Sequence, residues 1–199
     1  MNEKNLAGKI NYFKTLPLEV KKRQEKSFEA SDYECFALVG KEKKDIETYI
    51  RVIYKKTISL FGRAFAVIWF YDDGISKEFY LEQLDTLTLK FQSNDWLIYE
   101  LCNYGDVEKL LASWGEFDIL DILFPINIGE YTREINDGFY CNYNKYRKDY
   151  LSWVKNMGLV ISDSGDGEEV QVVYRKDFRN ELEEIFTDDE NDYKIIITR

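Results

Sequence analysis

The sequence predicts an α+β fold with mainly antiparallel strands and packed helices. Short runs rich in β-branched and aromatic residues, typical of strands, alternate with apolar residues at three- and four-residue spacing, typical of helices. Asp-Gly pairs stand where hairpins between antiparallel strands would turn. Of the 199 residues, 45% are hydrophobic and only two are proline, so we expect an ordered core.

The first third of the chain predicts a surface helix, a buried strand, an amphipathic helix and a central strand. Gly62 stands where the C-cap of the amphipathic helix falls, because glycine adopts the left-handed conformation without strain. The continuous apolar run after it suits a strand that is covered on both faces. The four predicted ranges are 17–28, 33–39, 46–61 and 64–71.

The middle of the chain predicts two short strands and two helices. An Asp-Asp-Gly turn at 72–74 favours a hairpin whose second strand returns over 77–81. The segment 86–92 alternates cleanly, which indicates a strand with one face in water. Capping residues and glycines delimit helices over 93–103 and 106–114.

The last third predicts a second hairpin, further strands and two helices. An apolar run at 117–128 contains Pro125, which limits how the run can pair in a sheet. The other predicted elements are a hairpin of 130–135 with 139–143, helices over 146–157 and 177–186, and strands over 159–162, 170–174 and 193–198. We expect a single globular domain over 1–199, with a possible subdomain boundary near 115–129.

The absence of histidine removes much familiar chemistry. Histidine is the side chain that titrates nearest neutral pH and the commonest metal ligand, so the usual general base and the usual zinc site are missing. Cys35, Cys102 and Cys141 are widely spaced and form no Cys-x-x-Cys pair, which indicates free thiols in a reducing, cytoplasmic setting. We therefore expect no cofactor.

An enzyme that works with carboxylates and a divalent ion is an alternative. The loop 163–169 clusters acidic residues with glycines, which suits cations that prefer oxygen ligands. It does not match an EF-hand, because Tyr174 stands at the twelfth position, where a bidentate Glu is needed. Asp118 and Asp121 form a carboxylate pair of the kind that glycoside hydrolysis uses. In so acidic a chain such clusters also arise from solvated turns and surface charge.

A nucleic-acid-binding regulator is a second alternative. The order helix, strand, loop, strand near the C-terminus resembles the end of a winged-helix domain. The helix would carry Lys145, Arg147, Lys148 and Lys155, but the loop that should contact phosphate is acidic. The electrostatics therefore argue against nucleic acid as the partner.

The charge distribution favours a protein partner. Residues 1–60 hold 13 basic and 9 acidic side chains, a net of +4, and residues 163–199 hold 5 basic and 12 acidic ones, a net of −7. An acidic surface attracts basic partners, and Tyr-rich segments supply rigid contact area. The predicted contact residues are Asp188, Asp189, Glu190, Asp192, Tyr140 and Tyr143.

In composition the chain resembles bacterial immunity proteins and phage-encoded inhibitors of host nuclease defences. That resemblance implies a non-catalytic cytoplasmic protein that captures and blocks a basic toxin or nuclease-like protein. No apolar run has the length of about 18 residues that a membrane span needs, so we expect no membrane association.

Overall fold

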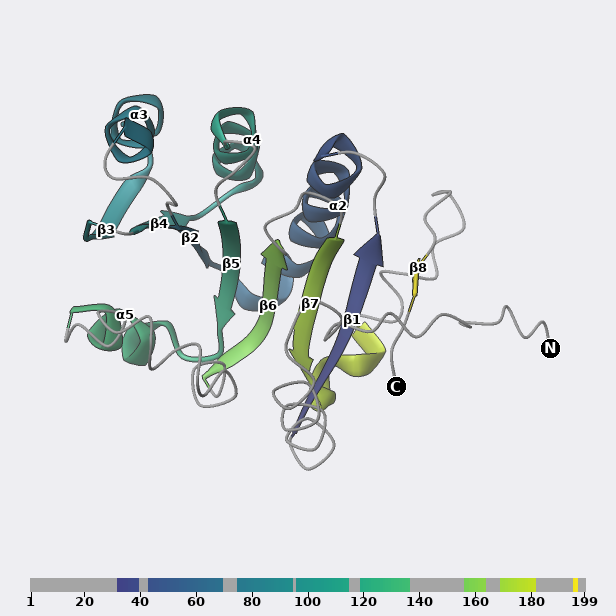
Figure 1. The fold of residues 1–199 in the computed structure, drawn as a ribbon. Helices are drawn as coiled ribbons and strands as arrows, with labels where there is room; N and C mark the ends of the chain where they lie inside the picture. The colour runs from purple at the N-terminus through teal and green to yellow at the C-terminus, as the bar shows by residue number, and fades with distance from the viewer. Residues whose placement is uncertain are drawn as a thin grey trace, which may run out of the picture.

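The computed structural model describes residues 32–39, 43–69, 75–94, 96–114, 119–136, 156–163, 169–181 and 195–196. These residues form one antiparallel sheet of eight strands with helices packed on it (Figure 1), which confirms the predicted α+β class. In spatial order the strands are β3 (Thr88–Gln92), β4 (Trp96–Leu101), β2 (Ala64–Trp69), β5 (Ile119–Pro125), β6 (Met157–Asp163), β7 (Glu169–Arg175), β1 (Tyr33–Val39) and β8 (Ile195–Ile196).

Three helices cover one face of the sheet and one helix lies on the other face (Figure 1). The covering layer runs in the order α3 (Ile75–Gln83), α4 (Tyr104–Ser113) and α2 (Lys43–Phe61), from the β3 side towards the β1 side. The helix on the opposite face is α5 (Ile128–Asn136). A short 3-10 turn, η2 (Lys176–Phe178), follows β7.

Strand β2 shows why the central strands read as continuous apolar runs. Its alternate residues Ala66 and Ile68 belong to the core beneath α2, α3 and α4. Phe65 and Val67 belong to a second core on the α5 face, where the Phe65 ring lies 4.7 Å from the ring of Tyr131. Both faces of the strand exclude water, so apolar side chains are favoured at every position.

The predicted helix over 46–61 and its glycine cap are confirmed. Gly62 has a φ of +76°, and its N–H donates a 2.7 Å hydrogen bond to the carbonyl of Ile58. The helix predicted over 106–114 is also present, but it begins earlier than expected. Asn103 is its N-cap and forms a capping box with Asp106, so Asp106 lies inside the first turn.

The strand predicted over 77–81 is wrong: this segment is helix α3. Tyr80 and Leu84 are both fully buried and stand four residues apart, so they lie on one side of the helical turn. The amide N–H of Leu84 donates to the carbonyl of Tyr80 at 2.9 Å, which continues the helical pattern past Gln83. The Asp-Asp-Gly sequence at 72–74 favoured a hairpin whose second strand would follow it, and helical packing against the sheet overrode that local preference.

Two further predictions fail. The segment 93–103 is not a helix, because it contains strand β4, whose six residues are all buried. A continuous apolar run of this length fits a buried strand and a buried helix equally well. The segment 130–135 is not a hairpin strand, because it lies in α5. The side-chain Oδ1 of Asn127 accepts a 3.1 Å hydrogen bond from the N–H of Glu130, as at a helix N-terminus.

The run at 117–128 contains β5, which pairs with β2 on one side and β6 on the other. Pro125 is its last residue, at a register shift, where a missing N–H costs least. The strands predicted over 33–39, 64–71, 86–92, 159–162 and 170–174 correspond to β1, β2, β3, β6 and β7, and β8 lies within 193–198. Residues 179–181 are helical, as predicted. The helix predicted over 17–28 and the strand over 139–143 lie outside the described residues. Of the helix predicted over 146–157, residues 146–155 also lie outside them, and its last residue is wrong, because Met157 begins β6.

Candidate functional site

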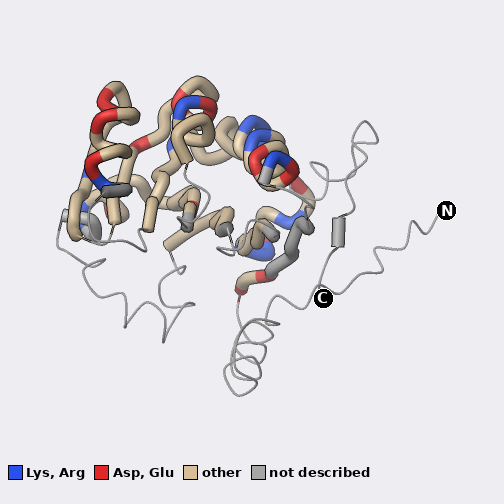
Figure 2. Tube along the Cα trace, turned by 45° about the horizontal axis from the view of Figure 1, so that its top comes forward, with Lys and Arg blue, Asp and Glu red and all other residues tan. Residues whose placement is uncertain are grey.

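Charge is unequally distributed over the helical layer. Helix α2 carries five basic and two acidic residues, whereas α3 and its following turn, residues 75–87, carry one lysine and three carboxylates. Figure 2 shows Asp and Glu at α3 and a mixture with Lys and Arg at α2, on opposite sides of the layer. The acidic end of this layer is therefore the end above β3.

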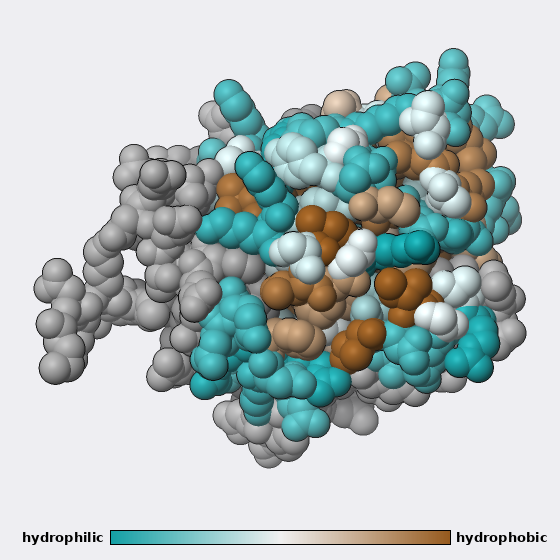
Figure 3. Space-filling view, turned by 180° about the vertical axis from the view of Figure 1, so that it is seen from behind, coloured by the Kyte–Doolittle hydropathy of each residue, from teal (hydrophilic) through white to brown (hydrophobic). Residues whose placement is uncertain are grey.

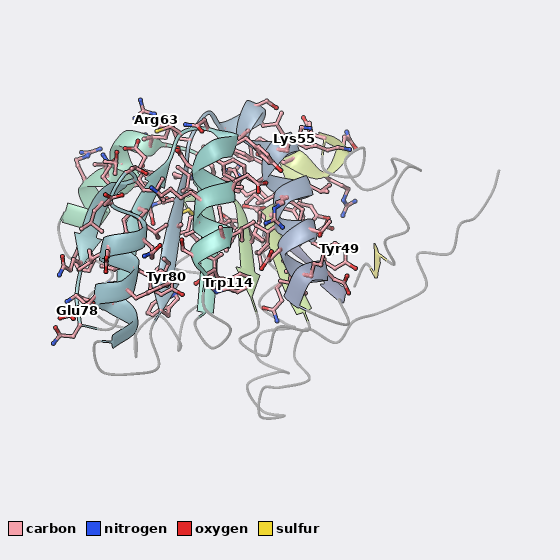
Figure 4. All side chains as sticks on the ribbon, turned by 90° about the horizontal axis from the view of Figure 1, so that it is seen from above. Tyr49, Lys55, Arg63, Glu78, Tyr80 and Trp114 are labelled. Carbon is pink, nitrogen blue, oxygen red and sulfur yellow. The ribbon has the colours of Figure 1, made fainter. Side chains whose placement is uncertain are left out.

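Helix α3 presents an exposed aromatic ring beside a pair of carboxylates. Phe79 is 46% exposed, and Glu78 and Glu82 are exposed beside it, one helical turn apart. Figure 4 shows Glu78 on the outer side of α3 and Tyr80 on the side towards α4. Seen from behind, hydrophobic residues surface over α3 between hydrophilic ones (Figure 3). Within the described ranges, no cation pairs with Glu78 or Glu82. We refer to Glu78, Phe79 and Glu82 as the α3 face.

Strand β3 adds a second apolar side chain on the same side of the sheet. Leu89 is paired with Tyr99, and directly opposed residues of an antiparallel pair point to the same face. Tyr99 belongs to the core beneath the helices, so Leu89 also points to the helical side, where it is 38% exposed. The α3 face and Leu89 thus border the same corner of the molecule.

The corner is held in place by one buried and two exposed contacts. The hydroxyl of Tyr99 donates to the carbonyl of Tyr80 at 3.3 Å, which ties α3 to β4. Lys109 of α4 lies 3.5 Å from Asp85 and donates to the hydroxyl of Thr86, which anchors the turn between α3 and β3. The acidic side chains of α3 therefore project from a fixed scaffold.

A buried carboxylate lies beneath this corner. Glu100 of β4 is 7% exposed, and its two oxygens lie 2.8 Å from Arg63 Nη1 and 2.7 Å from Lys90 Nζ. Burial raises the pKa of Glu100, but hydrogen bonds and charges from Lys90 and Arg63 outweigh that effect and leave the pKa below its usual value. The cluster joins β3, β4 and the residue before β2, and its two cations hold the one buried carboxylate in its charged form.

A second buried carboxylate lies at the centre of the sheet, on the α5 face. Asp121 is 1% exposed; Trp69 Nε1 donates to its Oδ2 at 2.9 Å, and the hydroxyl of Ser162 donates to its Oδ1. The register places Asp121, Ser162 and Gln171 side by side on three neighbouring strands. Asp118, its predicted partner in carboxylate chemistry, lies outside the described residues.

The predicted contact residues are not brought together by the described part of the chain. Asp188, Asp189, Glu190, Asp192, Tyr140 and Tyr143 all lie outside it, as do Lys145, Arg147, Lys148 and Lys155 of the predicted recognition helix. Asp163 and Glu169 end β6 and begin β7, and the loop between them is not described. Among the described residues, no group of three metal-ligating side chains converges.

Sequence reasoning missed the α3 face because it assigned 77–81 to a strand. In a strand, Glu78 and Phe79 would point to opposite faces and Glu82 would lie beyond the strand end. The helical spacing of Glu78 and Glu82, and of Tyr80 and Leu84, is the signal that indicates the correct arrangement.

Comparisons with protein-family models, with curated protein sequences and with solved structures found no match to the chain. No helix in the described ranges is long and apolar enough to cross a membrane.

Proposed function

We propose that this protein is a non-catalytic binding protein of the inhibitor type, which captures a basic protein partner through an acidic surface. One observation carries the proposal: on α3, the exposed ring of Phe79 lies beside the carboxylates of Glu78 and Glu82, which stand one helical turn apart, and no described cation pairs with either carboxylate. The α3 face combines an apolar anchor with unpaired negative charge. Interfaces commonly place aromatic residues at the centre and charged residues around them.

The spacing of the two carboxylates makes a bound cation favourable. Like charges four residues apart on a helix repel each other, by about 0.2–0.5 kcal/mol in exposed positions. A Lys or Arg from a partner, placed between Glu78 and Glu82, replaces this repulsion with two attractions. Both carboxylates are exposed, so salt screens the interaction and binding weakens as ionic strength rises.

A basic protein that binds nucleic acid is a suitable partner class. Such proteins expose Lys and Arg to contact phosphates, and an acidic protein competes for the same side chains. The exposed ring of Phe79 adds apolar contact with the partner, and the phosphate backbone of a competing nucleic acid has no such apolar group. Blocking a toxin or a nuclease-like protein in this way requires only a stable complex.

The acidic C-terminal segment stays a predicted second contact. Asp188, Asp189, Glu190 and Asp192 contribute four of the 37 carboxylates of the chain, and Tyr140 and Tyr143 are the proposed aromatic anchors. The two acidic surfaces make separate predictions, because each can be reversed in charge without changing the other.

Affinity purification tests the proposal. The tagged chain is expressed in its source cells and recovered at low salt together with any protein of high isoelectric point. The double variant Glu78→Lys/Glu82→Lys is expected to lose that protein. The matched control is Glu130→Lys/Glu181→Lys, which changes the net charge equally at exposed positions on α5 and after η2.

Retention of the partner by the α3 variant, with loss on charge reversal at 188–192, would move the contact to the C-terminal segment. Equal retention by all variants, at high salt as well, would contradict an acidic capture surface.

A further inference from the structure

We propose that the outer edge of β3 receives an extended segment of the basic partner as an added antiparallel strand. This inference rests on the proposed function and specifies how the partner is held. In the spatial order of the sheet, β3 is the last strand on its side, and among the described residues it pairs only with β4 (Figure 1). An edge strand leaves alternate N–H and C=O groups free to pair with another chain.

The two sides of this edge differ in chemistry. Leu89 points to the helical side, where it is 38% exposed near the acidic α3 face. Phe91 is paired with Ile98, which belongs to the core on the α5 face, and its ring lies 6.4 Å from the ring of Trp96. An added strand therefore meets carboxylates on one side and a half-buried aromatic ring on the other.

Lysine residues and bulges on an edge strand commonly discourage pairing. A register shift does occur between Leu89 and Phe91, around Lys90. The ammonium of Lys90, however, lies 2.7 Å from Glu100 Oε2, and Glu100 is paired with Phe65 of the core on the α5 face. Lys90 is therefore held on the side of the sheet away from α3, where the basic residues of an added segment would not meet it.

These features define the occupant: a segment that alternates Lys or Arg with apolar residues. Successive side chains of a strand point to opposite faces, so the basic residues lie on the helical side and the apolar ones beside Phe91. A Lys or Arg stem packs on Leu89, and its charged end extends towards Glu78 or Glu82. A second copy of this chain, paired edge to edge, would instead bring two sets of α3 carboxylates together, which is unfavourable.

The test uses the full, ¹⁵N-labelled chain and three synthetic heptapeptides followed by NMR at low salt. The first peptide alternates Lys and Val. The second has the same side chains but N-methyl groups on every backbone amide, which prevents N–H donation to β3 from either edge of the peptide. The third replaces Lys with Glu. We expect saturable shifts at Thr88–Gln92 with the first peptide, and at least a tenfold weaker affinity with the other two.

Two protein variants localise the contact. Leu89→Arg is expected to weaken binding of the Lys-Val peptide about tenfold or more, since it places a cation beside the bound lysines. The control is Leu60→Arg, at a leucine of α2 that is 45% exposed. The peptide comparison uses the unaltered protein, so a variant that fails to fold does not decide the result.

Absence of binding by the Lys-Val peptide, equal binding of its N-methylated form, or shifts centred away from β3 would overturn strand addition. Shifts at β3 that depend on protein concentration without peptide would show pairing between two copies, and would overturn it as well. The proposed function fails separately, by retention of the basic partner after charge reversal of Glu78 and Glu82 and of residues 188–192. A different outcome would reject strand addition and keep the proposed function. In it, the basic partner is lost on charge reversal of Glu78 and Glu82 or of residues 188–192, but the N-methylated peptide binds as tightly as the Lys-Val peptide.

Discussion

Trp69 Nε1 donates a 2.9 Å hydrogen bond to Oδ2 of Asp121, between neighbouring strands at the centre of the sheet. The hydroxyl of Ser162 donates to the other carboxylate oxygen from the strand on the far side. A nearly inaccessible carboxylate thus accepts hydrogen bonds from two strands, β2 and β6. Buried polar groups that are fully hydrogen-bonded help to fix a single register, because slippage leaves them without partners.

Replacement of Asp121 by alanine is expected to destabilise the fold by about 2–3 kcal/mol, since the buried Trp69 and the half-buried Ser162 lose their acceptor. Asp121→Asn keeps one acceptor oxygen and is expected to cost less. Urea denaturation followed by tryptophan fluorescence measures the difference. Equal stability of the wild type and Asp121→Ala would show that these hydrogen bonds contribute nothing to the fold.

Because of Glu100, the free energy of unfolding is expected to fall in acid. Its folded-state pKa lies below the unfolded value of about 4.3, so its contribution is complete above that pH and disappears as pH falls through the folded pKa. Glu100→Gln is expected to be less stable than the wild type at pH 7 and to lose less stability between pH 5 and pH 3. Urea midpoints across this range provide the measurement, and parallel pH profiles would contradict the ion-pair account.

Two buried tyrosines predict a loss of stability in alkali. Burial raises the pKa of Tyr33 to about 12, an effect that nearby Arg175 opposes, and burial raises the pKa of Tyr99 to about 12. Because the folded pKa exceeds the unfolded value of about 10, this contribution is present below pH 10 and is lost as pH rises through 12.

The double variant Tyr33→Phe/Tyr99→Phe is expected to have a shallower decline in stability between pH 10 and pH 12. Absorbance at 295 nm should show two fewer late-ionising phenols than in the wild type. Ionisation of every tyrosine near pH 10 in the folded protein would show that these rings are not buried.

Position 158, which is glycine, has no room for a side chain. A Cβ at this position would collide with Cε1 of Phe61, whose ring also packs against Phe124 and Phe178 with centroid separations of 5.5 and 4.9 Å. Gly158→Ala is therefore expected to cost about 1–3 kcal/mol through overpacking. The double variant with Phe61→Leu should recover part of this loss in thermal denaturation, and additive losses would argue against a direct contact.

The sequence predicts correctly those elements whose hydrophobic pattern is typical of only one kind of secondary structure. Helix α2 keeps its apolar residues on one face and ends at Gly62, and β2 carries an unbroken run of β-branched and aromatic residues. The run at Trp96–Leu101 has no period, because both of its faces are buried, and it was assigned to the wrong element. Local preference does not separate the two structures in such a run, so tertiary packing decides.

The candidate site was less accessible to sequence reasoning than the fold. Its side chains lie on α3 and β3, and the placement of α3 above the β3 side of the sheet depends on tertiary packing (Figure 1). Net charge indicated an acidic binding surface and pointed to residues 188–192. The exposed positions of Glu78, Phe79 and Glu82 follow only from a helical assignment.

We propose that the carboxylates of α3 bind a basic partner. The most direct measurement is the dissociation constant of the co-purified basic protein, determined by titration calorimetry for the wild type, Glu78→Lys/Glu82→Lys and Glu130→Lys/Glu181→Lys. We predict at least a tenfold weaker affinity for the α3 variant and little change for the control, with the difference shrinking at high salt. Equal affinities for the two double variants, or no basic partner at all, would contradict the account.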